Sequence, residues 1–439
     1  MSRFFLLNRR AITMALLLTL VFASVLTTHS QAAGSPITVW IDSTRQAAVD
    51  KFIAANPDAA DLIKVEIVDR ATFPAKVLLF NNTNSGWPDV VFAEPGLVAQ
   101  VSDASRDFPL DLRPFVDAKI LANFATGANG DCILPDGKLV CLRNDLAQNV
   151  LWYNVPLMKQ FGYSVPTTWE EYQALGEKVA KEHPGYLIGA FGDGQAMNNY
   201  FWSSGCPTGQ LVNATTVYIN TADPKCTRAA AMVDVLVANG SVSKSNPFDP
   251  AFIAQVTSGK LLIIPGASWY GEYIFGGKKD SMYFQTATGQ LGVALPPKWA
   301  ADPKALTGAQ GGAAWTVSKH TQNPELATKF VLFVTTDNGY QGTAPTFPAY
   351  TPAATLWAKT LTANPVYAQD PFPVLQQAAG LYDATWGNVR YDRAESFQRI
   401  IIAAMADGKT VTATLKDWQA DLVNLAQAQG YQVVTTLTK

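Results

Sequence analysis

The sequence predicts an α/β fold for the chain that follows residue 33. Short apolar runs alternate with apolar residues at helical spacing, a pattern typical of helices that cover buried sheets. The alternation opens with a strand, a helix and a second strand. No repeat, heptad array or low-complexity linker interrupts it. We therefore expect layered α/β structure, in which any two domains are joined without a long flexible tether.

The opening unit begins with the apolar run Ile37–Ile41, which we predict to be the first strand. Val49 and Phe52 then mark one face of a helix. This helix should stop before Pro57, because the residue that precedes a proline disfavours helical backbone angles. Two further strands are predicted at residues 65–68 and 89–93.

Helix start and stop signals organise the rest of the chain. Thr168 and Glu171 have the spacing of a capping box, so a helix should begin there. A strand should follow that helix at residues 186–190. The later predicted elements are a helix through 232–237 that ends at Gly240, a strand at 261–264 that ends at Pro265-Gly266, a helix that begins at Pro324, and two closing helices around 397–405 and 415–425.

Residues 1–33 have the features of an export signal. Arg3, Arg9 and Arg10 form a positive region, residues 11–26 are mainly apolar, and residues 30–32 offer small side chains for cleavage. We expect cleavage near Ala32 or Ala33, with an uncleaved anchor helix as the alternative. No later segment approaches about 18 uninterrupted apolar residues. The expected location is therefore the periplasm or the extracellular space.

The composition favours a globular protein. Hydrophobic residues make up 48% of the chain, aromatic residues 11% and charged residues 15%. Removing the three arginines of residues 1–33 from the 33 basic residues leaves 30, against 35 acidic ones. This acidic balance disfavours nucleic acid and acidic membrane surfaces as partners.

The four cysteines are expected to form two disulfides, because export leads to an oxidising compartment. Cys132 and Cys141 flank the turn sequence Pro135-Asp136-Gly137, which should bring them together. Cys206 and Cys226 are then left to pair. The alternative is a zinc site, but no Cys-x-x-Cys occurs and few histidines remain after cleavage. We therefore expect no metal site.

Tryptophan is the residue type that points to a ligand. The chain has 11 tryptophans, and four of them stand in segments expected to be strand ends and loops. An indole can cover the C–H face of a pyranose ring. Each of the four could instead be an ordinary core residue. The four candidates are Trp202, Trp269, Trp315 and Trp386.

Polar side chains that could bind sugar hydroxyl groups lie in or beside the same loops and strand ends. In open α/β sheets, ligands collect where strands end. Each of these side chains could instead be part of a solvated surface. The candidates are Arg45, Glu94, Asp145, Gln148, Asn149, Asn198, Asn199 and Arg390.

Motifs for catalysis are scarce. The sequence lacks a Gly-x-Ser-x-Gly elbow, a P-loop and a His-Glu-x-x-His motif. A carboxylate pair for glycoside hydrolysis stays open as an alternative, because the fold rather than local spacing brings such pairs together. We expect a binding protein that needs no cofactor, with a secreted carbohydrate-active hydrolase or lyase as the rival.

The order of several short motifs resembles the extracellular solute-binding proteins of ABC importers, in the family 1 group that includes maltose-binding protein. The resemblance extends from about Ile37 to Ala428. The matching segments are 37–40, 88–92, 136–138, 151–154, 166–171, 266–269, 311–319, 323–327 and 347–349.

This resemblance implies two α/β lobes with three hinge crossovers, and a sugar cleft between the lobes that closes on the ligand. With the crossovers near 144–150, 294–300 and 346–352, the N-terminal lobe takes residues 34–146 and 297–347. The C-terminal lobe takes residues 147–296 and 348–439.

The resemblance also implies roles for individual residues. Thr44 and Arg45 match the polar pair after the family's first strand, and Glu94 falls in the loop after the Pro-Asp strand that commonly faces the ligand. Asp145 matches an acid eight residues before the tyrosine of the Tyr-Asn motif. Trp202, Trp269, Trp386 and Arg390 match positions of the C-terminal lobe. The implied protein is a monomeric receptor that delivers a mono- or oligosaccharide to a membrane permease. A polyamine or another non-sugar ligand is a further alternative.

Overall fold

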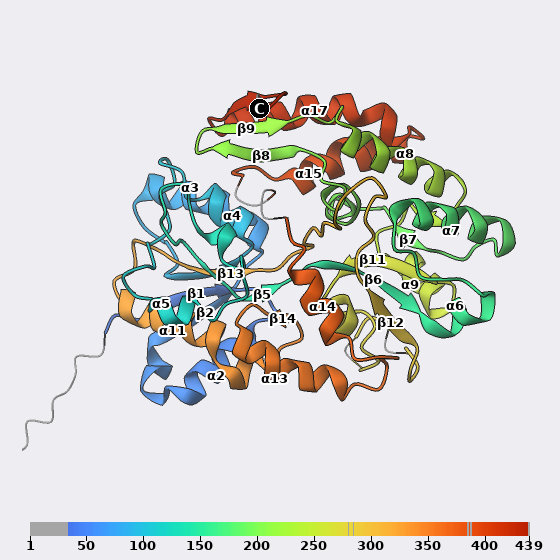
Figure 1. Cartoon of the computed structure of the whole chain (residues 1–439). Helices are drawn as coiled ribbons and strands as arrows, with labels where there is room; N and C mark the ends of the chain where they lie inside the picture. Colours follow the sequence, from blue (N-terminus) through green and yellow to red (C-terminus); the bar gives the residue numbers. More distant parts are fainter. Residues whose placement is uncertain (1–33, 280, 284, 384–385, 387–388, 438–439) are drawn as a thin grey trace, which may run out of the picture.

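The computed structural model describes residues 34–279, 281–283, 285–383, 386 and 389–437, so the expected signal peptide lies outside the described residues. The elements that follow residue 34 (blue) gather on one side of the molecule in Figure 1. Green and yellow elements form the other side, and the red helix α17 (Val411–Ala428) lies beside strand β9 (Thr216–Ile219) at the top. The expected α/β class is confirmed.

The first sheet is mixed and is built around β1 (Ile37–Ile41), whose bounds are those predicted. β1 pairs in parallel with both of its neighbours, and a strand from much later in the chain pairs antiparallel with the third strand. The sheet order is β2 (Ile63–Ile67), β1, β3 (Val90–Ala93), β13 (Ala314–Val317) and β4 (Leu142–Arg143).

Short helices surround this sheet. The predicted opening helix is α2 (Gln46–Ala55), and it ends at Asn56 immediately before Pro57, as expected. The other helical elements here are η1 (Pro57–Leu62), η2 (Arg70–Thr72), α3 (Phe73–Thr83), α4 (Pro95–Gln100), α5 (Ala118–Leu121), η3 (Gly130–Cys132), α11 (Pro324–Thr336) and α12 (Asn338–Gln341).

A second, antiparallel sheet has the order β11 (Ile263–Ala267), β6 (Asn149–Asn154) and β12 (Leu291–Ala294). The strand predicted at 261–264 was expected to end at Pro265. This prediction is wrong, because Pro265 lies inside β11 and pairs with Leu151 of β6. β11 is an edge strand, where the missing proline N–H costs no ladder bond. The smaller pairings are β14 (Phe347–Pro348) with β5 (Asp145–Leu146), β10 (Val242–Ser243) with β7 (Gly189–Ala190), and β15 (Gln432–Val434) with β9 and β8 (Thr208–Asn213).

The helices of this side follow most of the sequence signals. The capping box is confirmed at the start of α7 (Trp169–Glu182). The strand predicted at 186–190 is shorter, since β7 spans only Gly189–Ala190, although Leu187 also forms an isolated bridge with Leu261. The helix predicted around 397–405 is interrupted by a π-helical turn. The remaining elements are α6 (Val155–Phe161), η4 (Met197–Trp202), α8 (Pro224–Ala238), α9 (Pro250–Thr257), α10 (Tyr270–Tyr273), α13 (Thr351–Thr362), α14 (Phe372–Ala379), α15 (Arg393–Phe397), η6 (Gln398–Ile402) and α16 (Ala403–Ala406).

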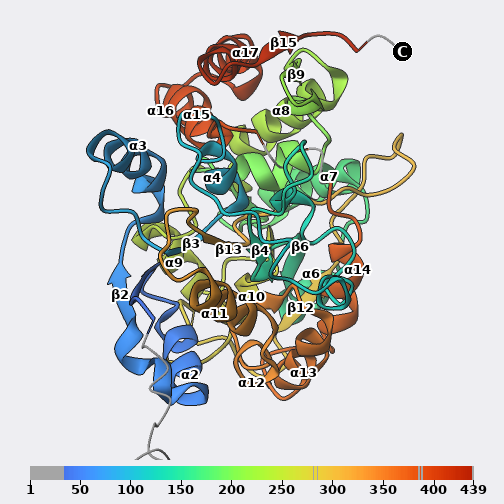
Figure 2. The same ribbon diagram turned by 90° about the vertical axis from the view of Figure 1, so that its left-hand side faces the viewer.

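Buried apolar side chains form three clusters. The first core draws on residues 37–142 and 313–349, the second core on residues 151–431, and the third core on residues 147–378. Figure 2 shows α17 at one end of the molecule and α12 and α13 at the other, with β3, β13 and β4 between them. The chain passes from the first core to the others along β4, β5 and β6, so these short strands connect the parts that carry the site.

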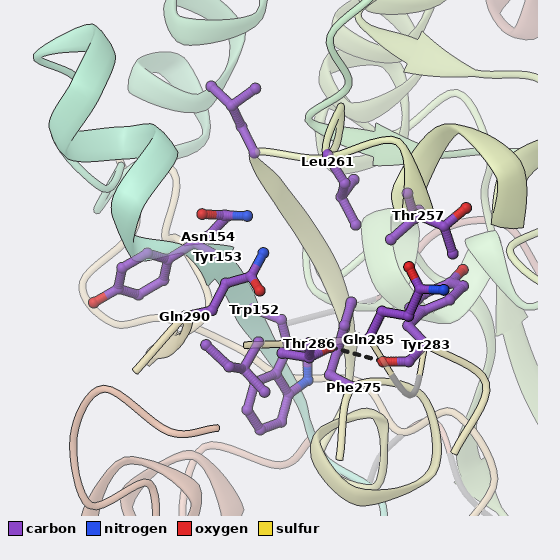
Figure 3. Close-up of a pocket in the computed structure, with 14 residues that line it drawn as sticks. Trp152, Tyr153, Asn154, Thr257, Leu261, Phe275, Tyr283, Gln285, Thr286 and Gln290 are labelled. Carbon is purple, nitrogen blue, oxygen red and sulfur yellow. Dashed lines mark hydrogen bonds between the residues drawn. The ribbon is translucent and has the colours of Figure 1, made fainter. Parts of the chain in front are cut away.

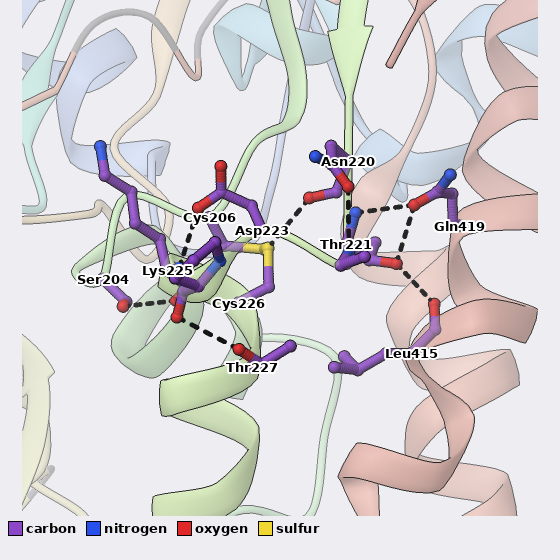
Figure 4. Close-up of a disulfide and its surroundings, with 12 residues drawn as sticks. Ser204, Cys206, Asn220, Thr221, Asp223, Lys225, Cys226, Thr227, Leu415 and Gln419 are labelled. Carbon is purple, nitrogen blue, oxygen red and sulfur yellow. Dashed lines mark hydrogen bonds between the residues drawn. A yellow bond between two sulfur atoms is a disulfide. The ribbon is translucent and has the colours of Figure 1, made fainter. Parts of the chain in front are cut away.

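Both predicted disulfides are present, Cys132–Cys141 and Cys206–Cys226. Gly137, in the turn between the first pair, has φ +83°, a left-handed angle that glycine adopts without strain. Figure 4 shows the second pair at the start of α8, where the Ser204 hydroxyl donates to the carbonyl of Lys225 at 2.6 Å. Within the described residues, no helix is both long and apolar enough to span a bilayer.

Candidate functional site

A large cleft lies between segments that belong to different cores, and it encloses about 1190 Å³, part of it open to solvent. Residues 69–71, 94–100, 131 and 143 form one wall, which we call the N-terminal wall. Residues 195–202 and 382–394 provide the described residues of the opposite wall, which we call the aromatic wall. Ala309 and Gly311 join the two walls.

The N-terminal wall presents an ion pair at the end of β3. Glu94 directly follows that strand, and its carboxylate lies 2.8 Å from Nη1 of Arg70. Both side chains are about one-third exposed (32% and 31%), so they are accessible from the cleft. The Arg70 guanidinium also lies 5.5 Å from the centre of the Phe92 ring, which fixes its direction.

The aromatic wall is built on the π-helical segment η4 and on the chain near residue 386. Trp202 and Trp386 stack, with ring centroids 5.1 Å apart and planes 9° from parallel. The Arg393 guanidinium lies over the Trp386 ring at 5.0 Å and also donates to the carbonyl of Trp386. Trp386 is fully buried and Trp202 is 6% exposed, so Trp202 provides the accessible apolar surface of this stack, and the Arg393 guanidinium beside it provides hydrogen-bond donors.

Asp131 is the most deeply buried acid of the cleft, at 5% exposure. Its Oδ2 accepts from the Tyr382 hydroxyl at 2.6 Å and from Arg143 Nη1 at 3.4 Å. Burial raises the pKa of Asp131, whereas Arg143 and the Tyr382 hydrogen bond oppose that shift. Burial, followed by the charge of Asp131, also raises the pKa of Tyr382. The phenol therefore stays protonated and acts as the donor.

The charges that line the cleft are almost balanced. Two of the three arginines are paired with carboxylates, Arg70 with Glu94 and Arg143 with Asp131. Among the described residues, no cluster of His, Cys, Asp or Glu could hold a metal ion. The charged lining residues are Asp69, Glu94, Asp131, Asp392, Arg70, Arg143 and Arg393.

Four of the thirteen residues named as ligand candidates line this cleft, namely Glu94, Asn198, Trp202 and Trp386. A fifth, Asn149, lies behind it in β6, where its side-chain amide donates to the carbonyl of Asn198 at 2.9 Å. Asn149 therefore supports the π-helical segment from behind. The loop structure expected around residues 198–202 is wrong, because these residues form η4.

Thr44, Arg45 and Asp145 do not line this cleft. Arg45 and Asp145 are both buried and form an ion pair at 3.9 Å. Arg45 also donates to the Thr44 hydroxyl at 2.7 Å. Thr44 lines a separate opening together with Tyr273. These three residues thus form one connected polar group at strand β5, which contains Asp145.

Trp269 borders the cleft without lining it. Its indole Nε1 donates to the carbonyl of Gln310 at 2.7 Å. A Cβ placed on the neighbouring Gly311, which does line the cleft, would lie 3.8 Å from that nitrogen. Trp269 is therefore tied to the segment that joins the two walls.

The structure places Trp315 and Arg390 elsewhere, so both predicted placements need correction. Trp315 is fully buried in the first core, where it packs against Phe92 and Phe330, because β13 inserts between β3 and β4. The Arg390 guanidinium lies 4.4 Å from the Tyr431 ring centre. Arg393 occupies the place by the tryptophans that was expected for Arg390.

Sequence reasoning missed most of the cleft lining, including the five residues whose ion pairs, hydrogen bonds and ring contacts are described above. Arg70 lies on a 3-10 turn that was not predicted, and Arg393 is only three residues beyond Arg390. One available signal was that two of these five residues flank the first disulfide. The five residues are Arg70, Asp131, Arg143, Tyr382 and Arg393.

A smaller pocket of about 630 Å³ opens beside the second sheet (Figure 3). It is lined by β6 residues such as Trp152 and Tyr153 and by residues near β11 and β12. None of the residues predicted to contact ligand lies there, and its lining comes from one side of the molecule only. It therefore does not share the two-walled geometry of the large cleft.

Comparison with known families gives a direct result. Residues 39–341 match the family model described as bacterial extracellular solute-binding protein. The chain belongs to this family. The matched residues include most of the N-terminal wall, η4 and the segment that joins the two walls, so the cleft is largely part of the region that defines this solute-binding protein.

Named relatives agree with this assignment. The solute-binding protein is 25% identical over 258 residues to a "Probable ABC transporter-binding protein" of Deinococcus radiodurans, a match that covers 56% of this chain and 57% of that protein. It is 26% identical over 204 residues to a "Multiple sugar-binding protein" of Streptococcus mutans, a match that covers 44% of this chain and 46% of that protein. The chain thus spans about half the length of the curated relatives it matches.

A solved structure shows the same fold. It is the galacto-N-biose-/lacto-N-biose I-binding protein of the ABC transporter from Bifidobacterium longum, in complex with lacto-N-biose. Its TM-score is 0.77 at 19% identity, and the match covers 92% of this chain and 100% of that chain. The expected binding-protein fold is therefore confirmed for this solute-binding protein.

Proposed function

We propose that this protein is the extracytoplasmic receptor of a carbohydrate ABC importer, and that it binds a mono- or oligosaccharide in the large cleft. The observation that carries the proposal is the composition of the two walls. The aromatic wall supplies the stacked Trp202–Trp386 pair, and the N-terminal wall supplies the accessible Arg70–Glu94 pair. Indoles cover the apolar face of a sugar ring, and paired polar groups bind its hydroxyls.

The near balance of charge supports a neutral ligand. A polyamine site would need an excess of unpaired carboxylates, whereas Glu94 and Asp131 are each paired with an arginine. The printed names of two matched proteins, which refer to sugar or to lacto-N-biose, agree with a carbohydrate ligand.

We further propose the domain division implied by the family. Residues 34–146 and 297–347 would form one lobe, and residues 147–296 and 348–439 the other, with three crossovers as hinges. The protein would be exported by a cleaved signal peptide to the periplasm or the extracellular space. As a monomer, it would present its closed form to a membrane permease and perform no chemistry.

A thermal-shift panel tests the proposal. The ligands are glucose, galactose, maltose, lactose, cellobiose, lacto-N-biose and acarbose, with spermidine as the non-sugar arm. A specific ligand at a hundredfold excess over its Kd stabilises the protein by about 2.7 kcal/mol. Stabilisation by at least one sugar and not by spermidine is expected. Stabilisation by spermidine alone, or release of monosaccharide from a bound disaccharide, would point to the polyamine or the hydrolase alternative.

A further inference from the structure

A hydrogen bond between a carboxylate and a phenol connects the two walls of the cleft. Asp131 belongs to the N-terminal wall, directly before Cys132, whose disulfide partner Cys141 stands two residues before Arg143. Tyr382 belongs to the aromatic wall and packs against the second core. The Tyr382 hydroxyl donates to Asp131 Oδ2 at 2.6 Å.

Asp131 is held in place from its own side. The Cys132–Cys141 bond joins the segments on either side of the turn at Gly137, with Cα atoms 5.0 Å apart. Arg143, at 3% exposure, contacts the same carboxylate oxygen that accepts from Tyr382. The disulfide and the buried Arg143 guanidinium therefore hold the Asp131 carboxylate in place. Because this carboxylate is held, it determines where the Tyr382 hydroxyl lies.

Tyr382 in turn contacts the stacked tryptophans. Its ring centroid lies 5.3 Å from that of Trp202, at 53° between the planes. The next residue, Asp383, accepts through its carbonyl from Trp202 Nε1 at 3.1 Å. Trp202 stacks on Trp386. A continuous series of contacts thus runs from the N-terminal wall to the aromatic surface.

We propose that Asp131 is a positioning residue, which orients the Trp202–Trp386 surface through the Tyr382 hydroxyl and so couples the approach of the two walls to sugar stacking. This inference rests on the proposed sugar-binding function. The contact links groups that different cores carry, so the tryptophan surface is fully ordered only when both walls meet. Neither Asp131 nor Tyr382 needs to touch the sugar for this role.

The test compares Tyr382→Phe with a matched control, Tyr163→Phe. Tyr382→Phe keeps the ring and removes only the hydroxyl. Tyr163 also donates to a carboxylate, Glu182 at 2.7 Å, but it lies outside the cleft and its ring contacts are Phe161 and His183. Two quantities are measured, the near-ultraviolet circular dichroism without sugar and at saturating sugar, and the Kd for the sugar of the panel that stabilises the wild type most.

Tyr382→Phe is expected to change the tryptophan dichroism and to weaken sugar binding about three- to tenfold, the range for one lost hydrogen bond. Tyr163→Phe should change neither quantity. A Tyr382→Phe protein whose tryptophan dichroism is unchanged both without sugar and at saturating sugar would overturn the inference, whatever its affinity. Altered dichroism with unchanged Kd would overturn it too.

Asp131→Ala completes a double-mutant cycle with Tyr382→Phe. If Asp131 acts through the phenol, the double variant has the same Kd as whichever single variant binds sugar more weakly. If the two residues have independent roles, their losses of binding free energy add, and that outcome contradicts the inference. Should Asp131→Ala fail to fold, Tyr382→Phe still decides the question.

If no sugar binds the wild type, the proposed function fails, and the dichroism of the ligand-free proteins separately decides whether Tyr382 orders the tryptophans.

Discussion

The imidazole of His320 lies flat on the indole of Trp87, with ring centroids 3.8 Å apart and planes 5° from parallel. Burial lowers the pKa of His320 below its ordinary value of 6.5, the neighbouring charge of Lys319 lowers it further, and Asp107 opposes both. The stacked ring is therefore favoured in its neutral form in the folded protein.

This relationship predicts an acid-sensitive contribution to stability. Because the folded-state pKa is lowered, the unfolded chain binds the proton more tightly, so stability rises with pH across this range. The contribution of the neutral His320 ring to the free energy of unfolding is complete above about pH 6.5. It is lost as the pH falls through the pKa of His320 in the folded protein. Melting temperatures of wild type and His320→Gln between about pH 7.5 and 5 should show a shallower acid decline in the variant. Parallel curves would contradict the prediction.

Trp202 and Trp315 provide a matched pair of buried indoles, one in the cleft and one in the first core. Trp202→Phe should weaken sugar binding about tenfold, because it removes part of the stacking surface. Trp315→Phe should lower the free energy of unfolding by about 1–3 kcal/mol and leave the Kd unchanged. Calorimetric titration and denaturant unfolding of both variants measure the two effects. A larger loss of affinity from Trp315→Phe would place the sugar elsewhere.

Trp269→Ala tests the indole beside the segment that joins the walls. If its ring contacts the ligand, as the family resemblance implies, the substitution should cost about 2–4 kcal/mol of binding, or roughly thirty- to several-hundredfold in Kd. Titration calorimetry measures the Kd, and thermal unfolding of the ligand-free protein is the control. A large loss of thermal stability with near-normal affinity would show that Trp269 has only a structural role.

The two disulfides should both contribute to stability. Replacing either pair with serine should lower the free energy of unfolding by about 2–4 kcal/mol, with the larger loss for Cys206–Cys226, because its sequence separation is 20 residues rather than 9. Denaturant unfolding measures the loss. Peptide mapping without reduction should recover the two local pairs from the exported protein, and crossed pairs or free thiols there would contradict the assignment.

Ligand should close the cleft. A sugar that contacts both walls binds the closed form more tightly and shifts the population towards it. Small-angle scattering should then report a smaller radius of gyration at saturating concentrations of the sugar that stabilises the protein most. The same measurement with spermidine is the control. An unchanged radius with bound sugar would argue against closure about the hinges.

Local features of the chain were predictable where neighbouring residues decide them. The bounds of β1, the capping box of Thr168 and Glu171 and the Cys132–Cys141 disulfide follow from short-range spacing and turn chemistry, and the Cys206–Cys226 disulfide then follows by elimination. The strand at 261–264 was misjudged because a proline ends a strand only when its N–H is needed. That requirement depends on whether the strand lies at the edge of its sheet.

The sequence by itself determined the α/β class, the family and the kinds of side chain available for a sugar site. Only the tertiary structure decided which of them meet. Trp315 and Trp202 both stand next to short runs of small residues, yet β13 inserts between two distant strands and buries Trp315 in the first core. Arg393 rather than Arg390 reaches the tryptophans, and Asp131 meets Tyr382 across 251 residues. Such contacts depend on long-range strand order and core packing, which local spacing does not encode.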